Sequence, residues 1–230
     1  MGVIVAMGGG FDDEYAWDLA EKLIKKTGKK KPAFLTIPTT GYDTGCGELS
    51  IYSKMGCDTD ILCVTHPGIT EEIIKDKIEK ADLINVPGGN LKFCMEHWRK
   101  HNAIKYLKEA FDRGAILFGS SSGSMCWFRQ GFDDCGPRGS FEFIDCCDII
   151  PYNNVPHYEG DFWHQFDSYA SMTQLSTIAC ENDTALVYEN GKYSIMICDK
   201  KPDARVWFFD AGEGYRRYDL TAHPEILERL

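Results

Sequence analysis

The chain has 230 residues, of which 43% are hydrophobic and 26% are charged, a composition typical of a folded globular protein rather than a disordered or collagen-like chain. Its longest apolar runs, at residues 3–7 and 115–118, are far shorter than the roughly 20 residues of a membrane-spanning helix. The 35 acidic side chains outnumber the 25 basic ones and give a net charge of −10, which argues against a nucleic-acid or anionic-membrane partner.

Short apolar runs alternate with amphipathic segments along the chain. Such runs are typical of parallel strands that are covered on both faces, and they predict buried strands at residues 3–7, 33–37, 60–64, 82–86 and 115–118. Helices are predicted between them, at residues 14–26, 50–55, 71–80 and, with one break, 93–113. Further strands, antiparallel and on the same sheet, are predicted at residues 185–188, 193–197 and 206–209.

This alternation predicts a three-layer α/β fold, a doubly wound and mostly parallel sheet with extra C-terminal strands. No repeat or low-complexity linker interrupts the chain, so we expect a single domain over residues 1–230. Sites in such sheets lie at the carboxyl ends of the strands. The loops at residues 8–10, 38–41, 87–90 and 119–123 are therefore expected to meet on one rim.

The ten cysteines do not have the spacing of a disulfide framework. No Cys-x-x-Cys pair occurs, and Cys63, Cys180 and Cys198 lie inside apolar runs. We expect no basic, cleavable leader before them. We therefore expect reduced, buried cysteines and a cytoplasmic protein.

The strongest local signal is the sequence Gly119-Ser120-Ser121-Ser122-Gly123, which follows an apolar run and precedes a helical segment. A strand that turns sharply into a helix can hold its turn residue in a strained conformation with the side chain exposed. Ser121 would then be a nucleophile, and the backbone N–H of Ser122 would stabilise an oxyanion. The plainer alternative is a Ser/Gly turn that caps a helix.

A nucleophilic serine needs a base and a group that orients the base. His157 is the preferred base among the six histidines, because Pro156 should fix an extended segment before it. His164 is the reserve candidate. Spacing alone leaves several carboxylates open as the orienting acid: Asp133, Asp134, Glu142, Asp145 and Asp148.

Over nearly its whole length the chain resembles the peptidase E family of serine dipeptidases, α-aspartyl dipeptidases on a fold similar to class I glutamine amidotransferases and flavodoxin. Four segments carry the resemblance in the family's order: Ile37-Pro38-Thr39-Thr40, Pro87-Gly88-Gly89-Asn90, the elbow from Gly119 to Phe128 with its Cys126-Trp127-Phe128, and Pro156-His157-Tyr158.

The resemblance implies that Ser121 is the nucleophile and His157 the base. It places the acid a little more than a dozen residues after the serine, where Asp134 matches best and Asp133 next. Gly89 would supply a second oxyanion N–H beside that of Ser122. Asn90, in the same loop as Gly89, is a candidate for substrate binding.

The resemblance further implies a short peptide substrate with N-terminal aspartate. The mechanism requires no metal or other cofactor, and we also consider a homodimer. Leu91 stands where the family has threonine after Gly-Gly-Asn, which removes a polar contact near the substrate. An aspartate side chain would need a cation, because an unpaired buried charge is costly. Arg129, Arg138 and Lys92 are the candidates.

Three other functions stay open. A glutamine-amidotransferase-like amidase would use a cysteine, and Cys126 lies five residues beyond Ser121, inside the following helix. A cyanophycinase-like enzyme would act on a β-aspartyl-arginine polymer. A binding protein without catalysis could keep the same fold.

Overall fold

Five adjacent parallel strands form most of a seven-stranded sheet in the computed structural model, which describes residues 2–12, 14–46 and 48–230. Its strand order is β11-β10-β1-β5-β4-β2-β3. The parallel strands are β1 (Val3–Met7), β2 (Ala33–Thr36), β3 (Asp58–Ile61), β4 (Leu83–Val86) and β5 (Ile116–Ser120). The hairpin of β10 (Thr184–Glu189) and β11 (Lys192–Ile197) extends the sheet through an antiparallel pairing of β10 with β1.

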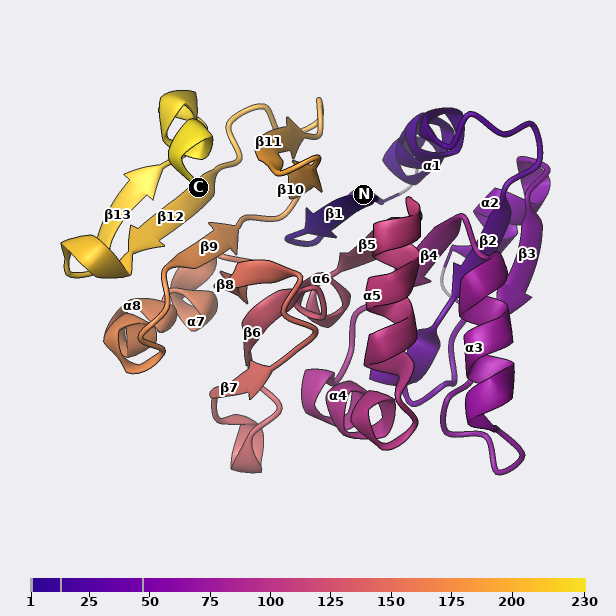
Figure 1. The fold of residues 1–230 in the computed structure, drawn as a ribbon. Coiled ribbons are helices and arrows are strands. Elements are labelled where there is room, and N and C mark those ends of the chain that lie inside the picture. The colour runs from indigo at the N-terminus through magenta and orange to yellow at the C-terminus, as the bar shows by residue number, and fades with distance from the viewer. Residues whose placement is uncertain (1, 13, 47) are drawn as a thin grey trace.

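Helices cover both faces of this sheet (Figure 1). Alternate residues of a strand point to opposite faces, so that Val3 and Val5 of β1 pack with the helices of one face and Ile4 with those of the other. The first face carries α1 (Glu14–Lys26) and α2 (Leu49–Lys54), and the second carries α3 (Glu71–Lys80), α4 (Leu91–Lys100) and α5 (Ala103–Arg113). The predicted three-layer α/β fold is confirmed.

A second sheet, of six strands, was not predicted. Its order is β13-β12-β9-β8-β6-β7. The strands are β6 (Phe128–Asp133), β7 (Glu142–Asp145), β8 (Ile150–Val155), β9 (Thr177–Cys180), β12 (Val206–Asp210) and β13 (Arg216–Asp219). The expectation that residues 206–209 join the first sheet is therefore wrong. The sequence did not predict β6, for example, because the exposed Arg129 interrupts its apolar run.

The remaining helical segments are short. They are α6 (Ser122–Met125), α7 (Gly160–Trp163), α8 (Phe166–Tyr169) and the 3-10 turns η1 (Pro38–Gly41), η2 (Pro137–Gly139), η3 (Ala170–Met172), η4 (Ala211–Glu213) and η5 (Pro224–Arg229). One buried cluster includes Ile4 and Leu117 from the first sheet together with Ile150 and Phe208 from the second. The division into a single domain stays a prediction.

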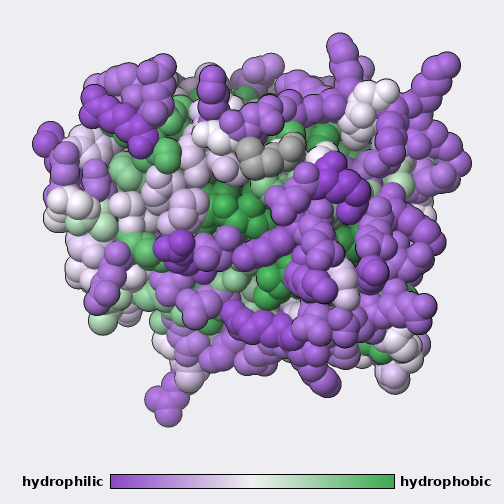
Figure 2. Space-filling model, in the orientation of Figure 1, coloured by the Kyte–Doolittle hydropathy of each residue, from purple (hydrophilic) through white to green (hydrophobic). Residues whose placement is uncertain are grey.

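Hydrophilic residues cover most of the face shown in Figure 2, and hydrophobic residues gather near its centre, between the two sheets of Figure 1. Across the three described stretches of chain, no helix combines the length and the apolar character that crossing a bilayer requires.

Candidate active site

Ser121 occupies the sharp turn between β5 and α6. Its backbone has φ 58° and ψ −129°, a region that costs a non-glycine residue about 1–3 kcal/mol. Glycines on both sides make the turn possible: a Cβ on Gly119 would lie 2.5 Å from the carbonyl oxygen of Gly123, and one on Gly123 would lie 1.9 Å from that of Val86. The strained strand–helix turn is the one that the sequence predicted.

Two backbone N–H groups flank Ser121. That of Ser122 begins α6, and that of Gly89 belongs to the loop after β4, where a Cβ would lie 2.2 Å from the carbonyl oxygen of Thr40. Neither group donates to another backbone group of residues 2–12, 14–46 or 48–230. Both therefore remain free to bind an oxygen of a bound molecule.

A chain of hydrogen bonds joins these two donors to Asp133. The Ser122 hydroxyl lies 2.7 Å from the carbonyl oxygen of Gly89 and 2.8 Å from Oδ2 of Asp133. A hydroxyl has one proton, so it cannot donate to both oxygens. Burial raises the pKa of the Asp133 carboxyl, and a protonated Asp133 that donates to Ser122 satisfies both contacts. Asp133 thus lies beside the oxyanion donors and not beside the imidazole.

His157 comes from the second sheet and lines the same pocket as Ser121. It follows β8, and its N–H donates to the carbonyl oxygen of Gly8, 2.8 Å away, at the end of β1. Its own backbone is left-handed, with φ 52°, rather than extended as expected. The imidazole lies against the glycine loop, because a Cβ on Gly9 would come within 2.5 Å of its Nδ1.

Asn182 is the partner of the imidazole. Nδ1 of His157 lies 2.6 Å from Oδ1 of Asn182, and Nδ2 of Asn182 donates to the carboxylate of Glu159. Asp134, which the resemblance favoured for this position, is exposed, and no hydrogen bond joins it to His157 in the described chain. Sequence reasoning missed Asn182 because it searched for an acid, whereas the group here is an amide between β9 and β10.

The other carboxylates considered are engaged elsewhere. Glu142 pairs with Lys92, Asp145 accepts a hydrogen bond from Gln130, and Asp148 pairs with Arg129.

One pocket of about 440 Å³ brings the candidate residues together. It is lined by Gly89, Ser121, Ser122, Asp134, His157, Glu159, Phe162, Trp163 and Asn182. His164, the reserve base, is not among these residues and packs instead on the ring of Tyr158. Asn90 is also absent from the lining, since its amide caps α4 through the N–H of Phe93 and donates to the hydroxyl of Tyr42.

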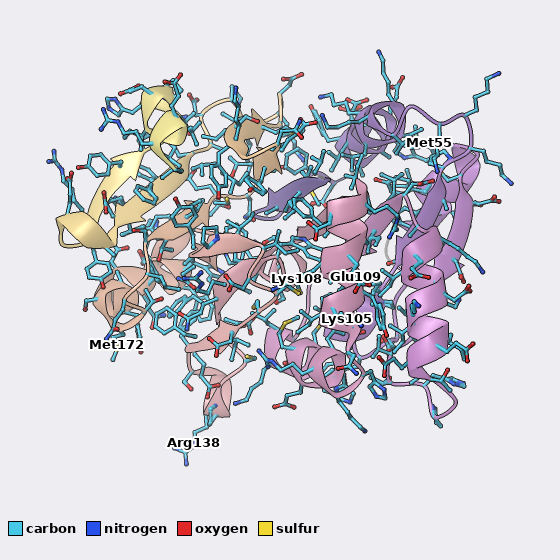
Figure 3. All side chains as sticks on the ribbon, viewed as in Figure 1. Met55, Lys105, Lys108, Glu109, Arg138 and Met172 are labelled. Carbon is cyan, nitrogen blue, oxygen red and sulfur yellow. The ribbon has the colours of Figure 1, made fainter. Side chains whose placement is uncertain are left out.

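The cations proposed for an aspartate side chain lie away from this pocket. Lys92 and Arg129 each form an ion pair of 2.8 Å, with Glu142 and Asp148. Arg138 extends from the tip of the segment after β6 (Figure 3). The pocket lining therefore contains two carboxylates, Asp134 and Glu159, and no lysine or arginine among the described residues.

All ten cysteines are free and six of them are buried, whereas Cys46 is exposed and Cys63, Cys135 and Cys146 are partly exposed. Cys126 is fully buried behind the elbow, where burial raises the pKa of its thiol well above the ordinary value. A thiol held neutral in this way is a poor nucleophile. The position gives no support to an amidotransferase-like cysteine mechanism.

A strained serine that is presented at the carboxyl edge of a doubly wound sheet, beside free backbone donors, is the arrangement that serine hydrolases use. The model of peptidase family S51 matches residues 4–196. The chain belongs to this family, and it is a serine-type peptidase that acts on a peptide substrate.

Known proteins agree with this assignment. An uncharacterized peptidase of Bacillus subtilis, YgaJ, is 26% identical over 164 residues, which cover 69% of each chain. Peptidase E of Haemophilus influenzae is 27% identical over 119 residues, 50% of this chain and 53% of the relative.

Two crystal structures share the fold. A peptidase from an acI-B1 actinobacterium superposes with a TM-score of 0.68 at 20% identity, covering 95% of this chain and 94% of that one. A putative peptidase E of Listeria monocytogenes superposes with a TM-score of 0.63 at 15% identity, covering 86% of this chain and 100% of that one.

Proposed function

We propose that the protein hydrolyses short peptides through an acyl-enzyme formed on Ser121. The observation that carries the proposal is that the strained Ser121 and the imidazole of His157 line the same pocket. His157 takes the hydroxyl proton while Oγ of Ser121 attacks the scissile carbonyl carbon. His157 then gives that proton to the leaving amine, and water activated by the same imidazole hydrolyses the ester.

The N–H groups of Ser122 and Gly89 stabilise the negative oxygen of each tetrahedral intermediate. A single donor of this kind contributes roughly 2.7–4 kcal/mol in comparable sites. Asn182 holds His157 with Nδ1 protonated, which leaves Nε2 as the base. An asparagine serves in this position in some cysteine peptidases as well. All of these steps use side chains and backbone groups of the chain itself.

The pocket favours a substrate with a free amino terminus. Asp134 gives the lining a negative charge that attracts the α-ammonium group of a short peptide, whereas the charge of Glu159 is offset by Lys201. The Asp134 carboxylate repels an aspartate side chain, and Lys201 already pairs with Glu159 and Asp183. The expected preference for N-terminal aspartate therefore has no support in the pocket, and we propose dipeptides with neutral or basic first residues.

A dipeptide panel tests this function. Dipeptides with Asp, Ala, Leu or Lys first, each with a free or an acetylated amino terminus, are incubated with the wild type and with Ser121→Ala. We expect hydrolysis of the free Ala, Leu and Lys peptides and at least about tenfold lower kcat/KM after acetylation, equivalent to about 1.4 kcal/mol. Ser121→Ala should lose activity by roughly 10⁶, as in comparable triads.

The neighbouring variant Ser120→Ala is the matched control, since it removes a hydroxyl from the last residue of β5, next to Ser121, and should keep activity. Hydrolysis that persists in Ser121→Ala would contradict the mechanism. Preference for the Asp peptides would contradict the proposed substrate. The β-aspartyl-arginine polymer is assayed beside the dipeptides. Turnover of this polymer alone would indicate a cyanophycinase-like enzyme, and no turnover of any substrate would indicate a binding protein.

A further inference from the structure

Asn182, the partner of His157, forms a second hydrogen bond, to Glu159, which the proposed mechanism does not use. The amide of Asn182 bonds to two groups at once, with Oδ1 towards Nδ1 of His157 and Nδ2 towards the carboxylate of Glu159. Glu159 follows His157 by two residues, at the start of α7, and its side chain is 40% exposed.

The carboxylate determines which way the amide of Asn182 faces. A carboxylate only accepts hydrogen bonds, whereas an amide has one accepting end and one donating end. Turning the amide by 180° would place Oδ1 against the Glu159 oxygens and Nδ2 against the imidazole. Glu159 therefore keeps the oxygen of Asn182 directed at His157.

The direction of the amide in turn determines which imidazole nitrogen carries the proton. An oxygen beside Nδ1 requires Nδ1–H and leaves Nε2 as an acceptor, whereas an NH₂ group beside Nδ1 would favour the opposite tautomer. Only the first tautomer can take a proton from Ser121 through Nε2. In a serine peptidase, imposing the wrong tautomer slows turnover by about 10⁴.

The surroundings fix the position of Asn182 but not the direction of its amide. Glu181 is held by the indole N–H of Trp207, at 2.9 Å, and Asp183 accepts the N–H of Phe11, also at 2.9 Å. Lys201 lies 3.9 Å from Glu159 and offsets its charge. The contribution of Glu159 is thus directional rather than electrostatic.

We infer that Glu159 is a positioning residue that sets the tautomer of His157 through the amide of Asn182. This inference rests on the proposed function, because it assigns His157 as the base. Glutamine can supply a carbonyl oxygen to Asn182 without a charge, whereas alanine supplies no acceptor. Glu159→Gln should therefore retain the arrangement, and Glu159→Ala should lose it.

The test combines tautomer measurement with kinetics. In ¹⁵N NMR of histidine-labelled protein, with the His157 signals assigned from their loss in His157→Gln, the neutral ring should be protonated at Nδ1 in the wild type and in Glu159→Gln. Glu159→Ala should give a mixture of tautomers. Its kcat should fall about 10- to 100-fold, as is typical when a supporting partner is lost, with KM little changed.

Asp161, an exposed carboxylate in the same short helix, provides the charge-matched control, and Asp161→Ala should leave both tautomer and kcat unchanged. An unaltered tautomer in Glu159→Ala would overturn the inference, as would a rise in KM alone, which would make Glu159 a substrate contact. The tautomer is read without substrate. A failure of the proposed peptidase mechanism would instead appear as activity in Ser121→Ala.

Discussion

Ser122 has two roles, one for its backbone and one for its side chain. The backbone N–H faces the pocket, whereas the hydroxyl ties the carbonyl of Gly89 to the carboxyl of Asp133. The second oxygen of Asp133 is buried without a partner among the described residues. Burial of this carboxyl disfavours its charged form and raises its pKa.

The raised pKa of Asp133 predicts a pH dependence of stability. Between the ordinary pKa of an aspartate and the raised value, the folded state holds a proton that the unfolded state has released, so the free energy of unfolding falls as pH rises. Asp133→Asn keeps a donor for Ser122 and should remove this component. Urea unfolding at a series of pH values measures it, and equal pH slopes for the wild type and Asp133→Asn would contradict the assignment.

Loss of the Ser122 hydroxyl has a different expected effect. Ser122→Ala leaves the Gly89 carbonyl and Asp133 without their shared partner, which should lower the free energy of unfolding by about 1–3 kcal/mol. The oxyanion N–H remains, but the Gly89 loop is no longer tied to it, so kcat should fall as well. Chemical denaturation and steady-state kinetics would measure both effects. Unchanged stability would show that the hydroxyl does not bridge these groups.

Among the site residues, the turn at Ser121 and the glycines that permit it could be predicted from the sequence, because both follow from local geometry. The Ser121 and His157 assignments stay predictions until variants are tested. Asn182 and Glu159 could not be predicted. Asparagine and glutamate are common in turns. The roles of Asn182 and Glu159 arise only because the ends of β8 and β9 lie beside the end of β1, and no local sequence pattern predicts that contact.

The elements that surround the site come from both sheets. The loop after β1 supplies Gly9, the end of β8 supplies His157, and the turn between β9 and β10 supplies Asn182. The predicted meeting of the glycine loops on one rim is confirmed by their contacts, among them the N–H of Asn90 donating to Thr40 at 2.7 Å. Buried strands were predictable from continuous apolar runs, whereas the half-exposed strands of the second sheet were not.

The packing of Gly9 against the imidazole predicts the effect of a single methyl group. In Gly9→Ala the new Cβ would lie 2.2 Å from Oδ1 of Asn182 and 2.5 Å from Nδ1 of His157, so these two side chains must move apart. We expect turnover to slow by about a hundredfold or more, the typical cost of a misplacement of about 1 Å. Steady-state kinetics on a cleaved dipeptide would measure the change.

Gly114→Ala is the control for this variant. Gly114 also has a positive φ, 109°, but an added Cβ there meets no atom within 4 Å. Both variants should lose stability through backbone strain, and only Gly9→Ala should lose activity beyond the unfolded fraction. Equal specific activities of the two folded variants would show that the contact with His157 is unimportant.

The two sheets share one large hydrophobic cluster, so the unfolding of either sheet should disrupt the other. Residues from both sheets bury each other in that cluster, and the pocket lies where they join. This arrangement predicts that the chain unfolds as a single cooperative unit, as a one-domain protein should. Urea unfolding followed by tryptophan fluorescence and by far-ultraviolet circular dichroism should give coincident transitions, and two separated transitions would contradict the single domain.

The overall α/β architecture was accessible from the sequence because alternation of strand and helix is a repeated, local signal. The second sheet and its junction with the first arise from long-range pairing, such as that of β8 with β9 and of β9 with β12. The homodimer stays a prediction that sedimentation velocity can decide.

Covalent labelling decides whether the protein has a serine nucleophile that a histidine activates. The wild type is treated with a fluorophosphonate, and the adduct is located by mass spectrometry of its peptides. We expect one adduct, on Ser121, formed much more slowly in His157→Ala and at the wild-type rate in His164→Ala. An adduct on another residue, or labelling of Ser121 that does not depend on His157, would contradict this mechanism.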